Sequence, residues 1–255
     1  MTTQLAFEIT QAEREVADLL PVNAPVADCR RVLDSTPIWF HTFALNQEAG
    51  LYTPGLARDH RYRIPFLPTD LTGQSVLDVG TCDGFYAFLA EARGATRVLA
   101  VDNEQYCRMV KGRWNIDITG GSTFRTMSAL LGSRVDYLKA DALDLAGFPE
   151  RFDFVYCCGM LHRVENPLGM LQILRGLLNP GGRILLETYG APTDTPVMQV
   201  LAAGEANSGD DVHYWGFSAR ALARLAEWSG LAETGDTLET TIDGHPRIIG
   251  TLTAV

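Results

Sequence analysis

The sequence predicts an α/β protein with one mostly parallel sheet of seven strands, helices on both faces and an antiparallel hairpin at the C-terminal end. Two observations predict this class. From Ser75 onward, short runs rich in β-branched residues alternate with helix-length stretches, which is the pattern of consecutive βαβ units. The last two predicted strands, 232–241 and 246–253, flank the turn-forming pair Asp243-Gly244, so they run antiparallel.

Two short helices precede the first strand of the sheet. They are predicted at 8–20 and 26–35, and the second begins after Pro25 and ends before Pro37. An aromatic, turn-rich segment follows them without a helical period. We therefore expect residues 1–70 to form an N-terminal helical cap that covers a ligand site in the rest of the chain.

Residues 71–255 are expected to form the core. After residue 189, an irregular stretch rich in Pro and Asp predicts a lid over about 190–216, with a plain surface insertion as the alternative. Asn179-Pro180-Gly181-Gly182 is expected to separate the fourth core helix from the fifth strand. The first five strands are predicted at 75–79, 97–102, 135–139, 153–157 and 183–188. The core helices are predicted at 84–93, 104–113, 123–131, 168–178 and 218–228.

Length and composition fit one folded domain with local additions. The chain has 255 residues, of which 46% are hydrophobic and 20% charged. The acidic N-terminal stretch does not match a secretory signal and no run of about 20 apolar residues occurs, so we expect a cytoplasmic protein that does not enter a membrane. The five cysteines are odd in number and lack CxxC spacing, so we expect free thiols and no metal.

The formal net charge of −10 disfavours nucleic acid, because the long-range field of the protein repels phosphate. One basic patch, Arg58, His60, Arg61 and Arg63, is the exception, and a solvated loop is its simpler interpretation.

The most specific motif is VLDVGTCDG, in which a buried strand ends in a carboxylate and two glycines open a helix. The glycines let a ligand approach the backbone, and the helix N-terminus offers free N–H groups. The spacing is G-x-x-x-G and not the G-x-G-x-x-G of dinucleotide sites, so pyrophosphate binding is disfavoured. A site for an adenosine cofactor on a Rossmann-like sheet is favoured instead. The cofactor contacts expected here are Asp78, Gly80, Thr81, Asp83 and Gly84.

Two further strand ends complete the expected cofactor site. Asp102 ends the strand VLAVD, 22 residues after Gly80, where a carboxylate can accept both ribose hydroxyl protons. Asp141 follows the third strand and is expected to reach an adenine amino group, with a simple turn or helix cap as the alternative. Their neighbours Asn103 and Ala142, and Gly159 after the fourth strand, are also expected at the cofactor.

The acceptor is expected at the carboxyl end of the fourth strand, in the segment GMLHRVENPL. His162 is the candidate catalytic base, since an imidazole titrates near neutral pH. A structural histidine that bonds the loop backbone is the alternative. Aromatic residues of the cap and lid suit a flat or sugar-bearing acceptor. The substrate-binding residues expected are Trp39, His41, Tyr52, Tyr189, His213, Tyr214 and Trp215.

Together these motifs resemble the class I S-adenosylmethionine (SAM) dependent methyltransferases, in the group related to the tRNA wobble-uridine carboxymethyltransferases. The resemblance spans roughly residues 35–190. It rests on Trp39-x-His41 with Thr53-Pro54-Gly55, and on LDVGTCDGFYAFLAEARGA, VLAVD, GMLHRVENPL and GGRILLET. The first motif implies a cap placed over the cofactor. The others imply SAM contacts at Asp78, Gly80, Gly84, Asp102 and Gly159.

Two departures from the tRNA enzymes favour a small-molecule branch of this group. The tRNA enzymes resemble one another in a lysine-containing segment upstream of the core and in a Tyr-His-Arg cluster after the fourth strand. This chain has Leu161-His162-Arg163 there and no lysine before Lys111. The branch without these features resembles methyltransferases of bacterial specialised metabolism.

Three functions stay open at this point. The first is a methyltransferase that uses SAM and acts on a small molecule, with a hydroxyl oxygen as the expected nucleophile and no nucleic acid or membrane partner. The second is a tRNA-modifying transferase, which requires a continuous basic face around 58–63. The third is a SAM-binding protein without catalysis. A homodimer fits as well as a monomer, because the sequence does not set the oligomeric state.

Overall fold

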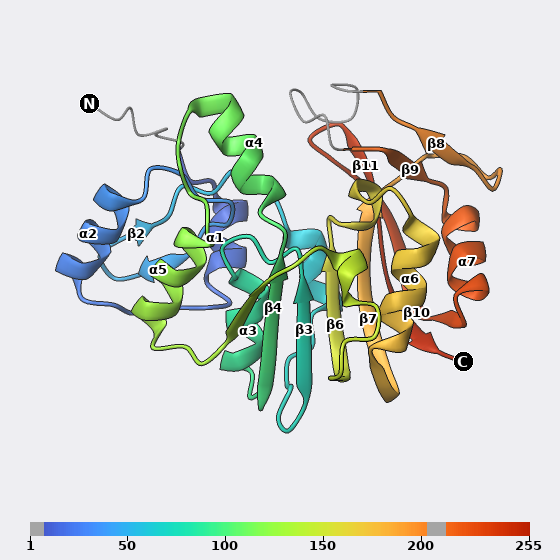
Figure 1. The fold of residues 1–255 in the computed structure, drawn as a ribbon. Helices are drawn as coiled ribbons and strands as arrows, with labels where there is room; N and C mark the ends of the chain where they lie inside the picture. Colours follow the sequence, from blue (N-terminus) through green and yellow to red (C-terminus); the bar gives the residue numbers. More distant parts are fainter. Residues whose placement is uncertain (1–7, 203–212) are drawn as a thin grey trace. The chain divides into compact units, whose positions relative to one another are not determined.

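In the computed structural model, the described residues are 8–202 and 213–255. Within these residues, seven strands form one sheet with the order β10-β11-β7-β6-β3-β4-β5 (Figure 1). The predicted sheet with a C-terminal antiparallel pair is confirmed. Its strands are β3 (Ser75–Val79), β4 (Arg97–Asp102), β5 (Asp136–Lys139), β6 (Phe152–Cys158), β7 (Leu178–Tyr189), β10 (Leu231–Ile242) and β11 (His245–Ala254).

Contacts divide the chain into two compact units. The first contains residues 1–72 and 81–139, and the second contains residues 73–80 and 140–255. No helix among the described residues is long and apolar enough to cross a membrane.

The first unit begins with the two predicted helices. Helix α1 (Gln11–Ala17) is shorter than predicted, because Thr10 and Glu13 form a capping box that fixes its start. Helix α2 (Val26–Ser35) has the predicted bounds. A small hairpin of β1 (Ala44–Asn46) and β2 (Leu51–Tyr52) and a 3₁₀ helix η1 (Arg61–Phe66) follow. The sequence did not predict these three elements. Strands of two or three residues carry no period, and η1 has only six residues with a proline among them.

Parallel strands β4 and β5 and three helices complete the first unit. The helices, α3 (Phe85–Ala92), α4 (Gln105–Trp114) and α5 (Ser122–Leu131), lie within a residue or so of the predicted bounds. Helix α3 is apolar almost all round, and its residues 85–90 are all buried. The rings of Phe88 and Phe124 stack with their centroids 4.9 Å apart, which packs α3 against α5.

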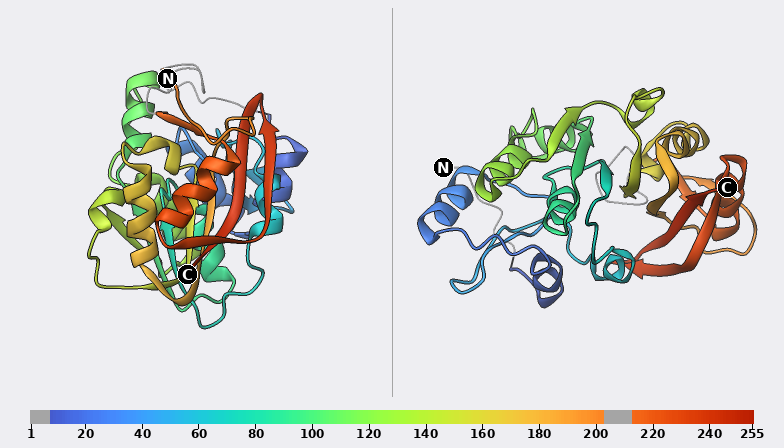
Figure 2. Two further views of the ribbon diagram at one scale, coloured as in Figure 1. Left: turned by 90° about the vertical axis from the view of Figure 1, so that its right-hand side faces the viewer. Right: turned by 90° about the horizontal axis from the view of Figure 1, so that it is seen from below.

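The second unit has parallel strands β3, β6 and β7 and antiparallel strands β11 and β10. Asp243 and Gly244 both have positive φ, 50° and 81°, as a type I′ turn between β10 and β11 requires. Helices α6 (Pro167–Gly176) and α7 (Ala219–Trp228) lie side by side, and α7 also contacts β10 (Figure 2). The 3₁₀ helices η2 (Ala142–Leu145) and η3 (Leu161–Arg163) follow β5 and β6.

One predicted boundary in this unit is wrong. Strand β7 begins at Leu178, although residues 179–182 were expected to be a break before the strand. The reason is that Leu178 pairs with Phe152 of β6, and a register shift between Phe152 and Phe154 accommodates the glycines. The predicted lid holds a two-stranded sheet of β8 (Met198–Val200) and β9 (Trp215–Phe217), while its residues 203–212 lie outside the described part of the chain.

Candidate functional site

The loop between β3 and α3 is wound tightly and has little room for side chains. Gly80, Cys82 and Gly84 all have positive φ, of 80°, 52° and 90°. A Cβ atom on Gly80 would lie 2.3 Å from the sulfur of Met160, and together with the φ of 80° this favours glycine there. Helix α3 begins after Gly84 without a side-chain cap. The first N–H groups of α3 therefore have no side-chain cap, and their contact with a ligand stays a prediction.

Asp102 connects the end of β4 to this loop. Its Oδ2 accepts a hydrogen bond from the Cys82 N–H at 2.7 Å, and its Oδ1 accepts one from the Glu104 N–H at 2.6 Å. Burial raises the pKa of Asp102, and the two backbone donors oppose that rise. Each carboxylate oxygen has a second lone pair, so two further hydrogen bonds can be accepted.

Asp83 anchors the segment that contains the Trp39-x-His41 motif. This fully buried carboxylate accepts hydrogen bonds at 2.8 Å from the backbone N–H groups of both Phe40 and His41. Its other oxygen bonds Nδ1 of the His41 ring. Thr81, next in the loop, donates its N–H to the carbonyl of Val101 at 3.1 Å. Both residues hold the loop in place, and their direct cofactor contact stays a prediction.

The other expected cofactor residues have mainly local partners. Asn103 Oδ1 accepts from Gln105 N at 2.9 Å, and Asp141 Oδ1 accepts from Leu143 N at 2.9 Å at the start of η2, of which Ala142 is the first residue. Asp141 thus forms the helix cap that the sequence left open as an alternative.

Two expected cofactor residues lie at strand ends of the second unit. Asp78 is buried in β3 beside Tyr156 of β6. Gly159 has φ of 80° and donates its N–H to the carbonyl of Glu187 at 2.9 Å. The turn after β6 is therefore tied to β7.

Three of the expected acceptor residues lie in the first unit, and all are buried there. Trp39 packs edge to face with Phe43, with their centroids 6.0 Å apart. The Tyr52 hydroxyl donates to Asp18 Oδ1 at 3.0 Å, and the Arg14 guanidinium lies 4.7 Å from the centroid of its ring. Tyr52 is therefore held by α1.

The remaining acceptor residues and His162 come together in the second unit. The rings of His162, Tyr189 and His213 form a triangle with centroid separations of 4.6, 4.8 and 4.8 Å. The Tyr214 N–H donates to the His162 carbonyl at 2.9 Å, and the Trp215 indole donates to the Val164 carbonyl at 3.0 Å. Residues from three separate parts of the sequence thus form one cluster, here called the imidazole cluster (His162, Tyr189 and His213).

The hydrogen bonds of His162 define its neutral form. Its Nδ1 accepts a hydrogen bond from the Tyr189 N–H at 3.4 Å and lies 3.1 Å from the Thr188 hydroxyl. Because an N–H points at Nδ1, the neutral ring carries its proton on Nε2. His162 is only 1% exposed, so this orientation is fixed by the surrounding structure.

Sequence reasoning missed a buried ion pair beside this cluster. Glu187 is fully buried in β7, and its Oε1 lies 3.3 Å from Nη1 of Arg247 in β11. The Arg247 guanidinium also lies 3.8 Å from the centroid of the Tyr189 ring. The acidic residue directly after the apolar run at 184–186 was the signal for this pair, since a buried charge requires a partner.

The basic patch at residues 58–63 does not form a free cationic face. Arg58 pairs with Glu13 at 3.1 Å, and Arg61 pairs with Asp59 at 2.8 Å. That Arg61 hydrogen bond lowers the pKa of Asp59. Arg63 is buried and donates to the Tyr86 hydroxyl at 3.2 Å. These guanidinium groups have acceptors within the protein.

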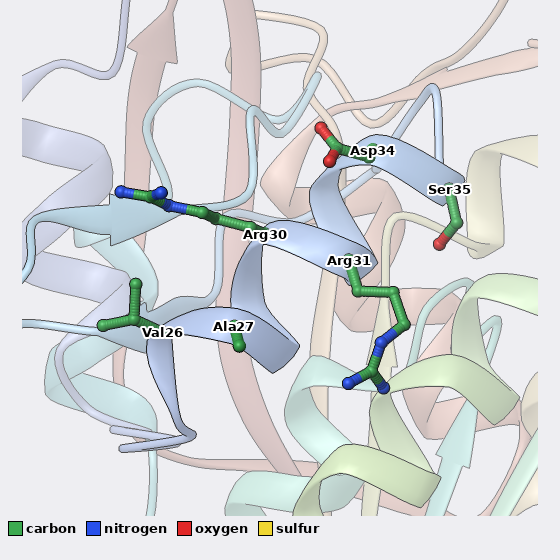
Figure 3. A pocket seen from close by; sticks show the side chains of 6 residues that line it. All are labelled: Val26, Ala27, Arg30, Arg31, Asp34 and Ser35. Carbon is green, nitrogen blue, oxygen red and sulfur yellow. The ribbon is translucent and has the colours of Figure 1, made fainter.

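Two further features of the described residues bear on ligands. A depression runs along α2 (Figure 3), and in it the guanidinium groups of Arg30 and Arg31 point to different sides of the helix. They do not converge on one ligand, and Arg31 pairs with Asp28. Among the described residues, no group of three His, Cys, Asp or Glu side chains is placed to hold a metal ion. The five cysteines are free thiols.

Residues 52–234 match the family described as a methyltransferase domain. The chain belongs to this methyltransferase family. The resemblance stated from the sequence motifs is thereby confirmed.

Curated relatives of this methyltransferase include two tRNA U34 carboxymethyltransferases. The one from Desulfotalea psychrophila is 29% identical over 130 residues, which cover 50% of this chain and 36% of the relative. The one from Alteromonas mediterranea is 30% identical over 135 residues, which cover 53% and 38%. The match therefore spans little more than a third of the length of these relatives.

Two solved structures share the fold of this methyltransferase. The N-terminal domain of EvdMO1, crystallised in the presence of S-adenosylhomocysteine (SAH) and D-fucose, has a TM-score of 0.63 at 19% identity, covering 98% of this chain and 100% of that one. The Burkholderia thailandensis 1,6-didemethyltoxoflavin-N1-methyltransferase, with its substrate and SAH bound, has a TM-score of 0.54 at 20% identity, covering 72% of each chain. At these identities the likeness concerns the fold.

Proposed function

We propose that this chain is a SAM-dependent methyltransferase that transfers a methyl group to a small molecule, at a hydroxyl oxygen of a specialised metabolite. The observation that carries the proposal is the arrangement at the end of β4. There the buried Asp102 carboxylate is held against a glycine-rich loop by the N–H groups of Cys82 and Glu104.

The residues present fit the adenosyl and amino-acid parts of SAM. Gly80 and Gly84 let the loop turn with φ of 80° and 90°, which places backbone N–H groups at the start of α3 where the amino-acid part of SAM is expected. Asp102 keeps lone pairs that can accept from a ribose diol. SAM, when bound, supplies a methyl group already activated by the positive sulfur, so in-line positioning of the acceptor contributes much of the catalysis.

The imidazole cluster supports a small and partly polar acceptor. It presents two imidazoles and one phenol from β7, η3 and the lid segment, a combination that offers both stacking faces and hydrogen-bond groups. Met160, the residue before the η3 turn that carries His162, places its sulfur against Gly80 of the glycine-rich loop. The structural neighbours crystallised with D-fucose and with 1,6-didemethyltoxoflavin agree with an acceptor of this size.

His162 is the residue proposed to handle the acceptor proton. A neutral ring with its proton on Nε2 can hold the acceptor oxygen by donating a hydrogen bond. To act as the base through Nε2, the ring must move its proton to Nδ1, against the Tyr189 N–H that donates there. The proposal therefore gives His162 an orienting role in which base catalysis requires a change of tautomer.

A tRNA acceptor is the second candidate, because the curated relatives modify tRNA. The pairing of Arg58, Arg61 and Arg63 inside the protein and the net charge of −10 disfavour it.

Calorimetry with SAM and with NAD tests the cofactor, and we expect binding of SAM alone. Incubation with SAM carrying a deuterated methyl group and a panel of small hydroxyl compounds, followed by mass spectrometry, tests the acceptor. If the deuterated group appears on tRNA instead, and the affinity for tRNA falls steeply between two salt concentrations, the second candidate is supported. SAM binding without transfer to any acceptor would indicate a binding protein.

A further inference from the structure

Glu104, two residues after Asp102, has an unusual backbone and an unusual degree of burial. Its φ is 60°, in the left-handed region that residues other than glycine, asparagine and aspartate rarely adopt. Glu104 is also only 3% exposed. The Glu104 N–H donates to Asp102 Oδ1 at 2.6 Å, which holds the backbone in this conformation. A charged residue is rarely kept in such a place without a partner.

Only half of the Glu104 carboxylate has such a partner among the described residues. Oε2 accepts from the Lys139 ammonium at 2.6 Å, and this ion pair fixes the orientation of the carboxylate. Oε1 is buried and has no hydrogen-bond partner within the described part of the chain. Buried polar atoms of folded proteins are nearly always hydrogen bonded, so this oxygen indicates a donor supplied from elsewhere.

The surroundings of Glu104 indicate what kind of ligand supplies the donor. Burial, and after it the negative charges of Asp102 and Glu104, raise the pKa of the Cys107 thiol to about 12. Burial is also the main cause of the raised pKa of Tyr137, and the same two carboxylates add to it. A site with this field repels a phosphate and favours a group that offers O–H or N–H donors.

We propose that Glu104 Oε1 accepts a hydrogen bond from a ribose hydroxyl of the SAM adenosyl group, so that Glu104 and Asp102 together bind the vicinal diol. This inference rests on the proposed function. Two carboxylates two residues apart provide an acceptor for each hydroxyl, and they reject nucleotides that carry a phosphate on the ribose. Glu104 is then a cofactor-binding residue in addition to Asp102.

The test is a thermodynamic cycle in which the Glu104 carboxylate and each ribose hydroxyl are removed singly and together. The affinity of each pair is measured by calorimetry on the full chain. SAH and its 2′-deoxy and 3′-deoxy forms are titrated into the unaltered protein, Glu104→Gln and Lys139→Met. We expect Glu104→Gln to weaken SAH binding by about ten- to a hundredfold, because the charged acceptor becomes a neutral amide whose oxygen faces the Lys139 ammonium and whose NH₂ group cannot accept. In the unaltered protein, removal of a ribose hydroxyl from SAH should lower the affinity, and this loss is here called the deoxy penalty. We expect Glu104→Gln to abolish most of that penalty for one of the two deoxy forms.

Lys139→Met is the matched control, since it breaks the same ion pair but keeps the charged carboxylate of Glu104 as an acceptor. We expect this variant to keep the full penalty for both deoxy forms. Glu104→Asp is a second variant should Glu104→Gln fail to fold, because aspartate tolerates a positive φ. It keeps the charge but withdraws the carboxylate by one methylene, and we expect it also to reduce the penalty.

Two outcomes would overturn the inference. If the Glu104 variants bind SAH and both deoxy forms with equally reduced or unchanged affinity, Glu104 is only the structural partner of Lys139, while the proposed function stands. If the unaltered chain does not bind SAH at all, the proposed function and this inference both fail.

Discussion

Asp83→Ala is expected to destabilise the protein severely, because one buried side chain satisfies three donors. Two of them are the backbone N–H groups of Phe40 and His41, each 2.8 Å from Oδ2, and the third is Nδ1 of the His41 ring. A hydrogen bond to a charged acceptor contributes about 1.5–3 kcal/mol, and a buried donor left unpaired costs about 1–3 kcal/mol. Partial repair by water reduces the total. We expect the free energy of unfolding to fall by about 3–5 kcal/mol.

Urea titration followed by circular dichroism and by tryptophan fluorescence measures this loss, and coincident transitions would justify a two-state fit. Asp117→Ala is the control, because Asp117 also accepts from a backbone N–H and a hydroxyl, both of Thr119, but at an exposed turn. It is expected to leave the midpoint nearly unchanged. A loss below about 1 kcal/mol for Asp83→Ala would refute the anchoring role of this carboxylate.

The remaining predictions concern Asp102, His162 and Gly80. Asp102→Ala is expected to weaken SAM binding by about 1–3 kcal/mol through loss of a charge-assisted bond to the ribose, and unchanged affinity in calorimetry would defeat that assignment. Because burial raises the pKa of Asp102, this group favours folding at pH values below its unfolded pKa, and that contribution is lost as the pH rises through the folded pKa. Asp102→Asn should therefore flatten the pH dependence of the unfolding free energy in this acidic range, as urea titrations at several pH values will show. His162→Ala should lower turnover without altering SAM affinity, and equal turnover at every pH would contradict its role at the acceptor. Gly80→Ala should cost about 1–3 kcal/mol of stability because of its φ of 80° and the Met160 sulfur in its path. Gly181→Ala, with φ of 79° but open space around it, should cost less, and equal losses in thermal unfolding would disprove the steric part.

Local patterns were sufficient to predict most of the secondary structure. The alternation of strands and helices from Ser75 onward, and the turn at Asp243-Gly244, depend on periodicity and on residues that accept positive φ, both of which act over a few neighbours. The start of β7 was predicted wrongly, because pairing of Leu178 with Phe152 overrides the local preference of the glycines.

The candidate site divides in the same way. The sequence by itself determined that Asp102 ends a strand and that Gly80 and Gly84 open a helix, since each depends on adjacent residues. Only the tertiary structure decided that Asp83 holds a segment more than forty residues earlier, and that Arg58 and Arg61 of the basic patch face acidic partners.

The same holds for the hydrogen bond that sets the proton of His162 and for the burial of Glu104. These properties depend on contacts between residues distant in the sequence, and the burial and charge of a side chain's surroundings exist only once the chain has folded.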